Sequence, residues 1–296
     1  MIRYYTELKE RDVYINVTKI PNVVKWGQLK LFLSETTFLS KMAAESKNKF
    51  LVLYIGAADG YHIGKLANLF PLYMFHLWDP RDFFVKESHN IKIFQKYFTD
   101  EEALKYDGDN ILIICDIRTL TIKYAKEEKD INRKIKKMDE IVDEDLKFQK
   151  KWVEKIKPYA AFLKFRLPYS FGTTTYFDGV IYLQQFGPMS TETRLLVRDT
   201  KKLKDYDNVE YDEKMVYFNN NIRPNKIDEW ENTLKKLNLK NNLDNAVMLE
   251  ILKEYIIVTT QKYSEENLML LVEDVLKYHR RYNDKYYQEM LRKKIS

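Results

Sequence analysis

Short apolar runs alternate with amphipathic helical patterns through the first two-thirds of this 296-residue chain. Two stretches, 26–42 and 136–157, carry apolar residues at helical spacing, as helices that cover a sheet do. Strands that alternate with helices form a mainly parallel sheet with helices on both faces, so the sequence predicts an α/β fold. The seven runs that we expect to form strands are 50–56, 74–79, 91–98, 111–118, 160–166, 179–186 and 194–199.

After about residue 227 the pattern becomes helical only. Its segments are 227–237, 245–258 and 264–294. Ser264 followed by Glu266 is typical of a helix start. We therefore predict two parts, a domain at residues 1–226 and a helical extension at residues 227–296 that can pack on the same domain. The last segment is basic, and a solvated helix face explains that charge better than a dedicated RNA-binding surface.

Composition limits the partners and the location that we expect. The net charge of +6 and the isoelectric point near 8.9 permit a polyanionic partner without requiring one. The single cysteine, Cys115, lies in an apolar run, which excludes a disulfide framework and a cysteine-based zinc site. The four histidines are scattered without ligand spacing, so we expect no metal. Residues 1–20 do not resemble a signal peptide and no apolar run reaches membrane-spanning length, so we expect a cytoplasmic protein without membrane contact.

Two glycines follow the first strong strand, in the stretch YIGAADGYH at residues 54–62. Gly56 and Gly60 permit positive φ and leave room for ligand atoms against the backbone, and the helix that follows would favour a carboxylate or phosphate at its N-terminus. The spacing is neither that of a dinucleotide fingerprint nor that of a P-loop. It suits an amino-acid-bearing nucleoside better, although two glycines also make an ordinary tight turn.

The next predicted strand ends in Asp79, nineteen positions after Gly60. In such folds a carboxylate at this strand end binds ribose hydroxyls, and Arg81 could flank an adenine or pair with Asp79. An aspartate in a surface turn is the alternative explanation. The glycine turn and Asp79 together favour S-adenosylmethionine as the ligand.

Four charged residues occur where the pattern predicts a core or its edge. Asp116 ends one apolar run, and Lys164 lies in another, where burial without a partner would cost several kcal/mol. Lys30 lies near the apolar stripe of the first helix, and Glu192 directly precedes the last strand. Each alone is most simply a surface charge. A lysine beside an aspartate at neighbouring strand ends is, however, suited to removing a proton from a hydroxyl group.

Several segments together resemble a known family, the cap-specific mRNA 2′-O-methyltransferases that poxviruses also use as the small, regulatory subunit of poly(A) polymerase. The resemblance covers roughly residues 25–226. The segments that carry it, in chain order, are WGQLKLFLSE, YIGAADGYHI, WDPRD, ILIICDIR, FLKFRLPYSF, ETRLLV and YDEKMVYFNNNIRPNK. It implies a Rossmann-like S-adenosylmethionine-dependent methyltransferase fold with the C-terminal helices as an extension.

The resemblance also implies roles for individual residues. The Lys-Asp-Lys-Glu tetrad of 2′-O-methyltransferases falls on Lys30, Asp116, Lys164 and Glu192. The residues that would line the S-adenosylmethionine pocket are Gln28, Tyr54, Gly56, Gly60, His62, Asp79, Arg81 and Arg118. The residues that would bind the 7-methylguanine of the cap are Tyr169, Asp212 and Tyr14. Two positions depart from the family pattern: Asp59 stands in place of a proline, and Phe171 stands in place of the second cap-binding carboxylate.

The function that the resemblance implies is transfer of a methyl group from S-adenosylmethionine to the 2′-hydroxyl of the first transcribed nucleotide of capped mRNA. Cap-0 becomes cap-1 and S-adenosylhomocysteine is released, without a metal. Basic residues outside the cleft would contact downstream phosphates. The catalytic subunit of a poly(A) polymerase is the expected protein partner, in the cytoplasm, a viral factory or a virion. Two alternatives remain, a non-catalytic RNA-binding polymerase subunit and a 2′-O-methyltransferase of RNA that is not capped.

Overall fold

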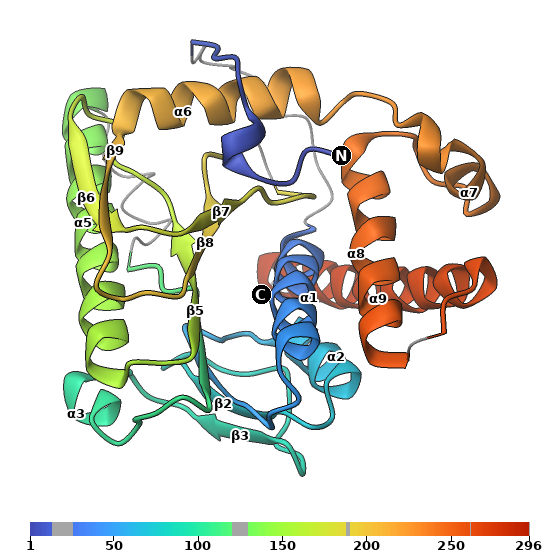
Figure 1. The fold of residues 1–296 in the computed structure, drawn as a ribbon, viewed down its shortest axis with the longest axis horizontal. Coiled ribbons are helices and arrows are strands. Elements are labelled where there is room, and N and C mark those ends of the chain that lie inside the picture. Colours follow the sequence, from blue (N-terminus) through green and yellow to red (C-terminus); the bar gives the residue numbers. More distant parts are fainter. Residues whose placement is uncertain (14–25, 120–129, 188–189, 261, 296) are drawn as a thin grey trace.

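The computed structural model of the protein describes residues 1–13, 26–119, 130–187, 190–260 and 262–295. All seven predicted strands form, and they make one sheet in the order β3-β2-β1-β4-β5-β8-β7 (Figure 1). The predicted α/β fold with a seven-stranded, mainly parallel sheet is therefore confirmed. Its strands are β1 (Leu51–Ile55), β2 (Met74–Trp78), β3 (Ile91–Phe94), β4 (Ile111–Cys115), β5 (Ala160–Phe165), β7 (Val180–Tyr182) and β8 (Thr193–Val197).

The order of the strands reverses at the middle of this sheet. β1 pairs in parallel with β2 on one side and β4 on the other, and β5 continues in parallel beyond β4. β8 runs antiparallel between β5 and β7. In open α/β sheets, ligands bind outside the carboxyl ends of the strands at the point where the order reverses. The topology therefore predicts a ligand site at the segments that follow β1 and β4.

Helices cover both sides of the sheet. α1 (Gly27–Glu45) and α2 (Tyr61–Leu69) lie on one side, while α5 (Ile131–Ile156) lies on the other, near the short α3 (Asp100–Ala103) (Figure 1). The ring of Phe38 on α1 stacks on Phe162 of β5 at 4.9 Å between ring centroids. The predicted helices at 26–42 and 136–157 are both present and differ from the observed ones by a few residues at their ends.

A second, two-stranded antiparallel sheet, which the sequence analysis did not predict, lies beside α5 (Figure 1). It consists of β6 (Thr173–Phe177) and β9 (Leu203–Asp207), after which α6 (Asn208–Tyr217) begins. Four of the five residues of β9 are exposed, so neither an apolar run nor a strict alternation marks it. The predicted strands at 91–98 and 179–186 were too long, because the chain leaves the sheet after residues 94 and 182.

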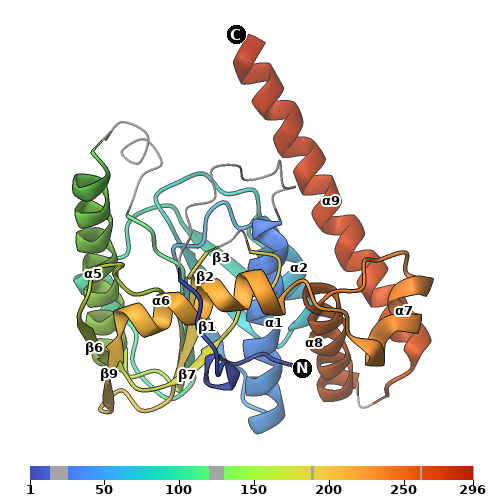
Figure 2. The same cartoon turned by 90° about the horizontal axis from the view of Figure 1, so that it is seen from above.

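The C-terminal segment is helical, as predicted. Its elements are the 3₁₀ helix η3 (Asp228–Trp230), α7 (Glu231–Lys236), α8 (Leu243–Thr260) and α9 (Glu265–Ile295). The hydroxyl of Ser264 accepts a hydrogen bond from the N–H of Asn267 at 3.1 Å, so the predicted helix start is confirmed. α8 packs against α1, and the end of α9 projects beyond the body of the protein (Figure 2). Among the described residues, no helix is long and apolar enough to cross a membrane.

Candidate active site

Four ionisable side chains that are distant in the sequence form one cluster at the carboxyl ends of β4 and β5. Asp116 directly follows β4, Lys164 is the fifth residue of β5, Lys30 lies in the first turn of α1, and Glu192 precedes β8. Lys164 Nζ lies 3.2 Å from Asp116 Oδ1 and 3.4 Å from Glu192 Oε2. Lys30 Nζ lies 2.5 Å from Glu192 Oε1. The structure thus brings all four residues of the predicted tetrad together.

Two arginines complete this cluster. Arg118 donates a hydrogen bond from Nη2 to Glu192 Oε2 at 2.7 Å, and Arg194 donates one from Nη2 to Asp116 Oδ1 at 2.7 Å. Arg194 was not predicted to belong to the site, although an arginine in a buried strand is a signal that could have revealed it. It is 1% exposed and pairs across the sheet with Lys164. Because two cations that face each other on a sheet repel, Asp116 is needed as their shared counter-ion.

Burial and the neighbouring charges shift the pKa values of three groups in the cluster. Burial alone would raise the pKa of Asp116, but Arg194 and Lys164 outweigh it and hold that pKa at about 2. Burial would also raise the pKa of Glu192, but Lys164 and Lys30 outweigh it and hold that pKa well below its ordinary value. Burial lowers the pKa of Lys30, and the nearby Glu192 opposes that effect. Both carboxylates are therefore ionised at neutral pH, and Lys30 gives up its proton more readily than an exposed lysine.

The glycine turn lies directly beside this cluster. Gly56 has φ +81°, and a Cβ atom there would lie 2.8 Å from the carbonyl carbon of Asp116. Gly60 has φ +71°, a conformation that side chains rarely adopt. A tight turn is thus sufficient to explain Gly56, and the same close approach places Asp116 next to the turn.

The first donors of α2 are bound by side chains of the protein itself. The N–H of Tyr61 donates to Asp59 Oδ1 at 3.3 Å, and the N–H of His62 donates to Gln28 Oε1 at 3.1 Å. That the N-terminus of this helix favours a carboxylate or phosphate of a ligand stays a prediction.

Three predicted pocket residues join a buried chain of hydrogen bonds. His62 Nδ1 lies 2.7 Å from Gln28 Oε1, and His62 Nε2 lies 2.9 Å from Glu35 Oε2. The Tyr54 hydroxyl donates to Glu35 Oε1 at 2.5 Å. The side chains of Tyr54 and His62 therefore lie in the interior, where they connect α1, β1 and α2. Glu35 was not predicted, yet its position on the apolar stripe of α1, three residues after Phe32, marks it as a buried acid.

Asp79 lies at the end of β2, beside the glycine turn, and is 4% exposed. Its carboxylate accepts hydrogen bonds from the N–H of Ala58 at 3.1 Å and from the N–H of Arg81 at 2.9 Å. The Arg81 guanidinium also binds it, through Nε at 2.9 Å and Nη2 at 2.8 Å. Arg81 was predicted either to flank an adenine or to pair with Asp79, and in the structure it pairs with Asp79. Ribose hydroxyls would reach this carboxylate in place of the guanidinium, whose side chain is 68% exposed.

Of the predicted cap-binding residues, Tyr169 lies in the loop after β5 and Asp212 lies on α6. The Tyr169 ring is partly exposed, and the guanidinium of Arg166 lies 4.2 Å from its centroid. Asp212 Oδ1 is buried without a hydrogen-bond partner among the described residues, and burial raises the pKa of Asp212 to about 6. Phe171 is 91% exposed and offers no carboxylate. Tyr14 lies outside the described residues.

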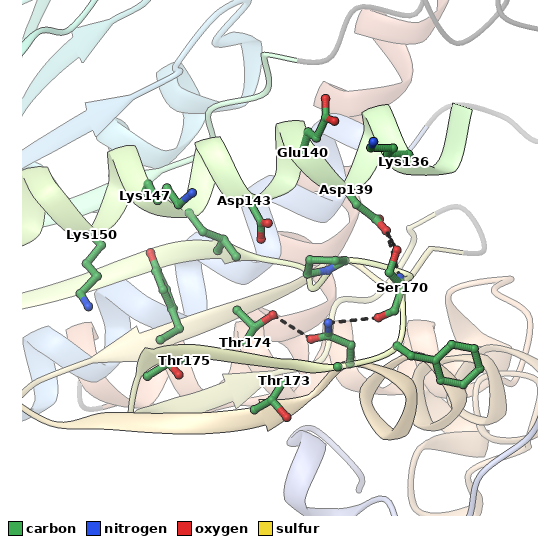
Figure 3. Close-up of a pocket in the computed structure, with 16 residues that line it drawn as sticks. Lys136, Asp139, Glu140, Asp143, Lys147, Lys150, Ser170, Thr173, Thr174 and Thr175 are labelled. Atoms are coloured by element: carbon green, nitrogen blue, oxygen red, sulfur yellow. Dashed lines mark hydrogen bonds between the residues drawn. The ribbon is translucent and has the colours of Figure 1, made fainter. Parts of the chain in front are cut away.

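A hollow of about 590 Å³ lies close to that loop, between α5 and β6 (Figure 3). Its wall combines cations and anions of α5 with the threonines of β6, and Asp139 accepts hydrogen bonds from the hydroxyl and the N–H of Ser170. No tetrad residue lines it. In the parts of the chain that the structure describes, no group of three His, Cys, Asp or Glu residues could hold a metal ion.

Comparison with known proteins agrees with the predicted family. Residues 2–281 match the family described as poly A polymerase regulatory subunit. The chain is similar to the cap-specific mRNA (nucleoside-2′-O-)-methyltransferase of fowlpox virus (strain NVSL), with 30% identity over 264 residues, which cover 80% of this chain and 79% of the relative. Both matches extend well beyond any single motif. The chain therefore belongs to the poly(A) polymerase regulatory subunit family.

Proposed function

We propose that this protein is an S-adenosylmethionine-dependent methyltransferase that methylates the 2′-hydroxyl of the first transcribed nucleotide of capped mRNA. The observation that carries the proposal is the convergence of Lys30, Asp116, Lys164 and Glu192 beside the glycine turn. A module that only bound RNA would not need two lysines and two carboxylates in one part-buried cluster. The name of the fowlpox relative supports the same chemistry.

Lys164 is the residue that we assign to removing the hydroxyl proton. It lies between Asp116 and Glu192, which orient its amine. Lys30 is held closer to Glu192, at 2.5 Å, and serves as the second cation. The cluster contains four cationic side chains, when Arg118 and Arg194 are counted, and two carboxylates that form ion pairs with them.

The cofactor would supply a methyl group already activated on a sulfonium, so the chain mainly has to position two bound reactants. Gly56 and Gly60 bring the backbone of the turn close to the methionine end, and Asp79 would bind the ribose once Arg81 has moved aside. These residues fit such a ligand, because a buried carboxylate follows β2 and a turn with two glycines at positive φ follows β1, beside the reversal point of the sheet.

Cap recognition is assigned to Tyr169 and Asp212. A 7-methylguanine is cationic, so it stacks favourably on an aromatic ring. The buried Asp212 Oδ1 atom that lacks a partner is suited to accept an N–H of the base. Arg166 lies close to the Tyr169 ring, so the base would use a different part of the ring surface. Because Phe171 stands in place of the family's second cap-binding carboxylate, we assign the binding of the base to the Asp212 carboxylate without a second acid.

The test is methyl incorporation into cap-0 RNA by the wild type, Lys164→Ala and Lys30→Ala, with Lys202→Ala as an exposed control. Loss of a general base lowers rates by about 10²–10⁴-fold, so Lys164→Ala should lose activity on that scale while it still binds S-adenosylmethionine. Incorporation equal to that of the wild type removes Lys164 from the assigned role. A loss only in Lys30→Ala transfers the role to Lys30.

Competition by free 7-methyl-GTP separates capped from uncapped substrates. If the activity on RNA is insensitive to 7-methyl-GTP, the substrate is RNA without a cap and the assignment of Tyr169 and Asp212 fails. If wild-type protein binds capped RNA but transfers no methyl group, the non-catalytic alternative is correct.

The family description supports a second role, as the regulatory partner of a poly(A) polymerase catalytic subunit. Co-purification with that subunit tests it. Lys164→Ala should co-purify as well as the wild type if the two roles use different surfaces.

A further inference from the structure

The C-terminal helix α9 packs directly on the glycine turn and the start of α2. The hydroxyl of Tyr278 donates a hydrogen bond to the carbonyl of Tyr61 at 2.8 Å. The hydroxyl of Tyr61 returns one to the carbonyl of Tyr278 at 3.0 Å, and the two rings lie 4.5 Å apart. The hydroxyl of Tyr282 donates to Asp59 Oδ2. Residues more than 200 positions apart are thus bound reciprocally at the edge of the candidate cofactor site.

Other contacts hold α9 in this position. The Tyr282 ring also packs against the Tyr61 ring, tilted by 40° and at 4.7 Å between ring centroids. Lys65 on α2 forms an ion pair with Asp274 on α9. His279 is 1% exposed and its ring lies 5.2 Å from Phe32 on α1. Helix α9 therefore contacts both helices that flank the glycine turn.

The turn itself is held from two directions. On the sheet side, Asp79 binds the N–H of Ala58, Arg81 binds the carbonyl of Ala58, and the N–H of Phe84 binds the carbonyl of Asp59. The contacts from Tyr278 and Tyr282 come from the opposite end of the chain. A binding loop that is already fixed in its bound shape loses less freedom when the ligand arrives.

We propose that Tyr278 and Tyr282 are positioning residues for the cofactor-binding turn, so that the C-terminal helix determines the affinity for S-adenosylmethionine. The inference rests on the proposed function, because it takes the turn at 56–61 as the cofactor site. The two tyrosines act through their contacts with Asp59 and Tyr61.

The experiment uses the full chain with Tyr278→Phe, Tyr282→Phe and the double variant. Phenylalanine keeps the ring contacts with Tyr61 and removes only the hydroxyl of each tyrosine. Tyr255→Phe is the matched control, because the Tyr255 hydroxyl of α8 donates to the carbonyl of Leu69 at 3.0 Å, at the far end of the same helix α2. It too joins the C-terminal segment to the domain, but away from the turn.

Isothermal titration calorimetry gives the dissociation constants for S-adenosylmethionine and for 7-methyl-GTP, and methyl transfer gives KM and kcat. Loss of one hydrogen bond corresponds to about a threefold to tenfold change in an equilibrium constant. Tyr278→Phe and Tyr282→Phe should raise the dissociation constant and KM for S-adenosylmethionine by that factor, with a larger effect on KM than on kcat. Affinity for 7-methyl-GTP should stay unchanged, and Tyr255→Phe should resemble the wild type in all four values.

A double-mutant cycle of Tyr282→Phe with Asp59→Ala supplies a second measurement. The two changes should be less than additive in S-adenosylmethionine affinity, since they remove the same hydrogen bond. Wild-type affinity in both tyrosine variants, or an equal loss of affinity in Tyr255→Phe, overturns the inference. A wild-type protein that binds no S-adenosylmethionine refutes the proposed function instead, so the two failures are distinguishable.

Discussion

Replacement of Asp116 by asparagine should destabilise the protein by an amount that the structure determines. The ordinary pKa of an aspartate is 3.8, and Arg194 and Lys164 hold that of Asp116 at about 2. At about 1.36 kcal/mol per pH unit, this difference corresponds to about 2 kcal/mol of stabilisation at neutral pH. Asparagine keeps an acceptor for Arg194 but removes the negative charge. We therefore expect the free energy of unfolding to fall by at least about 2 kcal/mol, because the buried Arg194 also loses its counter-ion.

The loss should depend on pH in a defined direction. Because the pKa of Asp116 is lower in the folded protein than in the unfolded chain, its contribution is complete above about pH 4. It decreases as the pH falls from 3.8 towards about 2. The difference in stability between wild type and Asp116→Asn should therefore be constant from pH 5 to pH 8.

Urea unfolding at pH 5, 6, 7 and 8, followed by tryptophan fluorescence, measures this difference. With a slope of about 3 kcal/mol per molar urea, a loss of about 2 kcal/mol lowers the midpoint by about 0.7 M. Asp199→Asn is the control, because Asp199 is half exposed and its pair with Lys202 is 3.8 Å long, so it should change stability by less than about 0.5 kcal/mol. A difference for Asp116→Asn below about 0.5 kcal/mol, or one that vanishes between pH 8 and pH 5, refutes the reasoning.

Three further predictions concern other parts of the site. Gly56→Ala should lower stability by about 2–4 kcal/mol in urea unfolding, because it adds a carbon 2.8 Å from the Asp116 backbone at a positive φ; wild-type stability would contradict the close approach. Affinity for 7-methyl-GTP should fall as the pH decreases through about 6, where Asp212 becomes protonated, and Asp212→Asn should bind weakly with a flatter pH profile; identical profiles would reject the assignment. Glu35→Ala should cost about 2–4 kcal/mol in thermal unfolding, since it removes the Glu35 partner of the buried His62 Nε2 and of the Tyr54 hydroxyl; a loss below about 1 kcal/mol would show that this network contributes little.

The main sheet was predictable because each of its strands is apolar enough to stand out. β4, for example, is buried at all five positions, and its residues are Ile, Leu, Ile, Ile and Cys. The sheet of β6 and β9 was not predictable from the same signal. Threonines occupy most of β6 and charged residues most of β9, and their pairing depends on two segments about thirty residues apart meeting beside α5.

The candidate site was predictable to a similar extent. Lys164 and Asp116 were notable because they are charged residues in or at the end of apolar runs, and Lys30 and Glu192 because they lie next to apolar segments. The resemblance to a family then assigned all four to one tetrad. Arg194 was missed although it lies in a buried strand, because its partner Asp116 follows β4, which is not a neighbour of β8. The contact of α9 with the glycine turn had no signal in the sequence at all.

The sequence alone determined the alternation of strands and helices, and with it the position of the glycine turn and of Asp116 at the ends of apolar runs. Hydrophobic periodicity is a local property, so it can be read over ten or twenty residues. Tertiary structure alone decided which groups bind each other. It pairs Arg194 with Asp116 and Glu35 with His62, and it packs α9 on the glycine turn. The physical reason is that a buried polar group must find a partner wherever the fold brings one within about 3 Å, and that distance does not depend on separation along the chain.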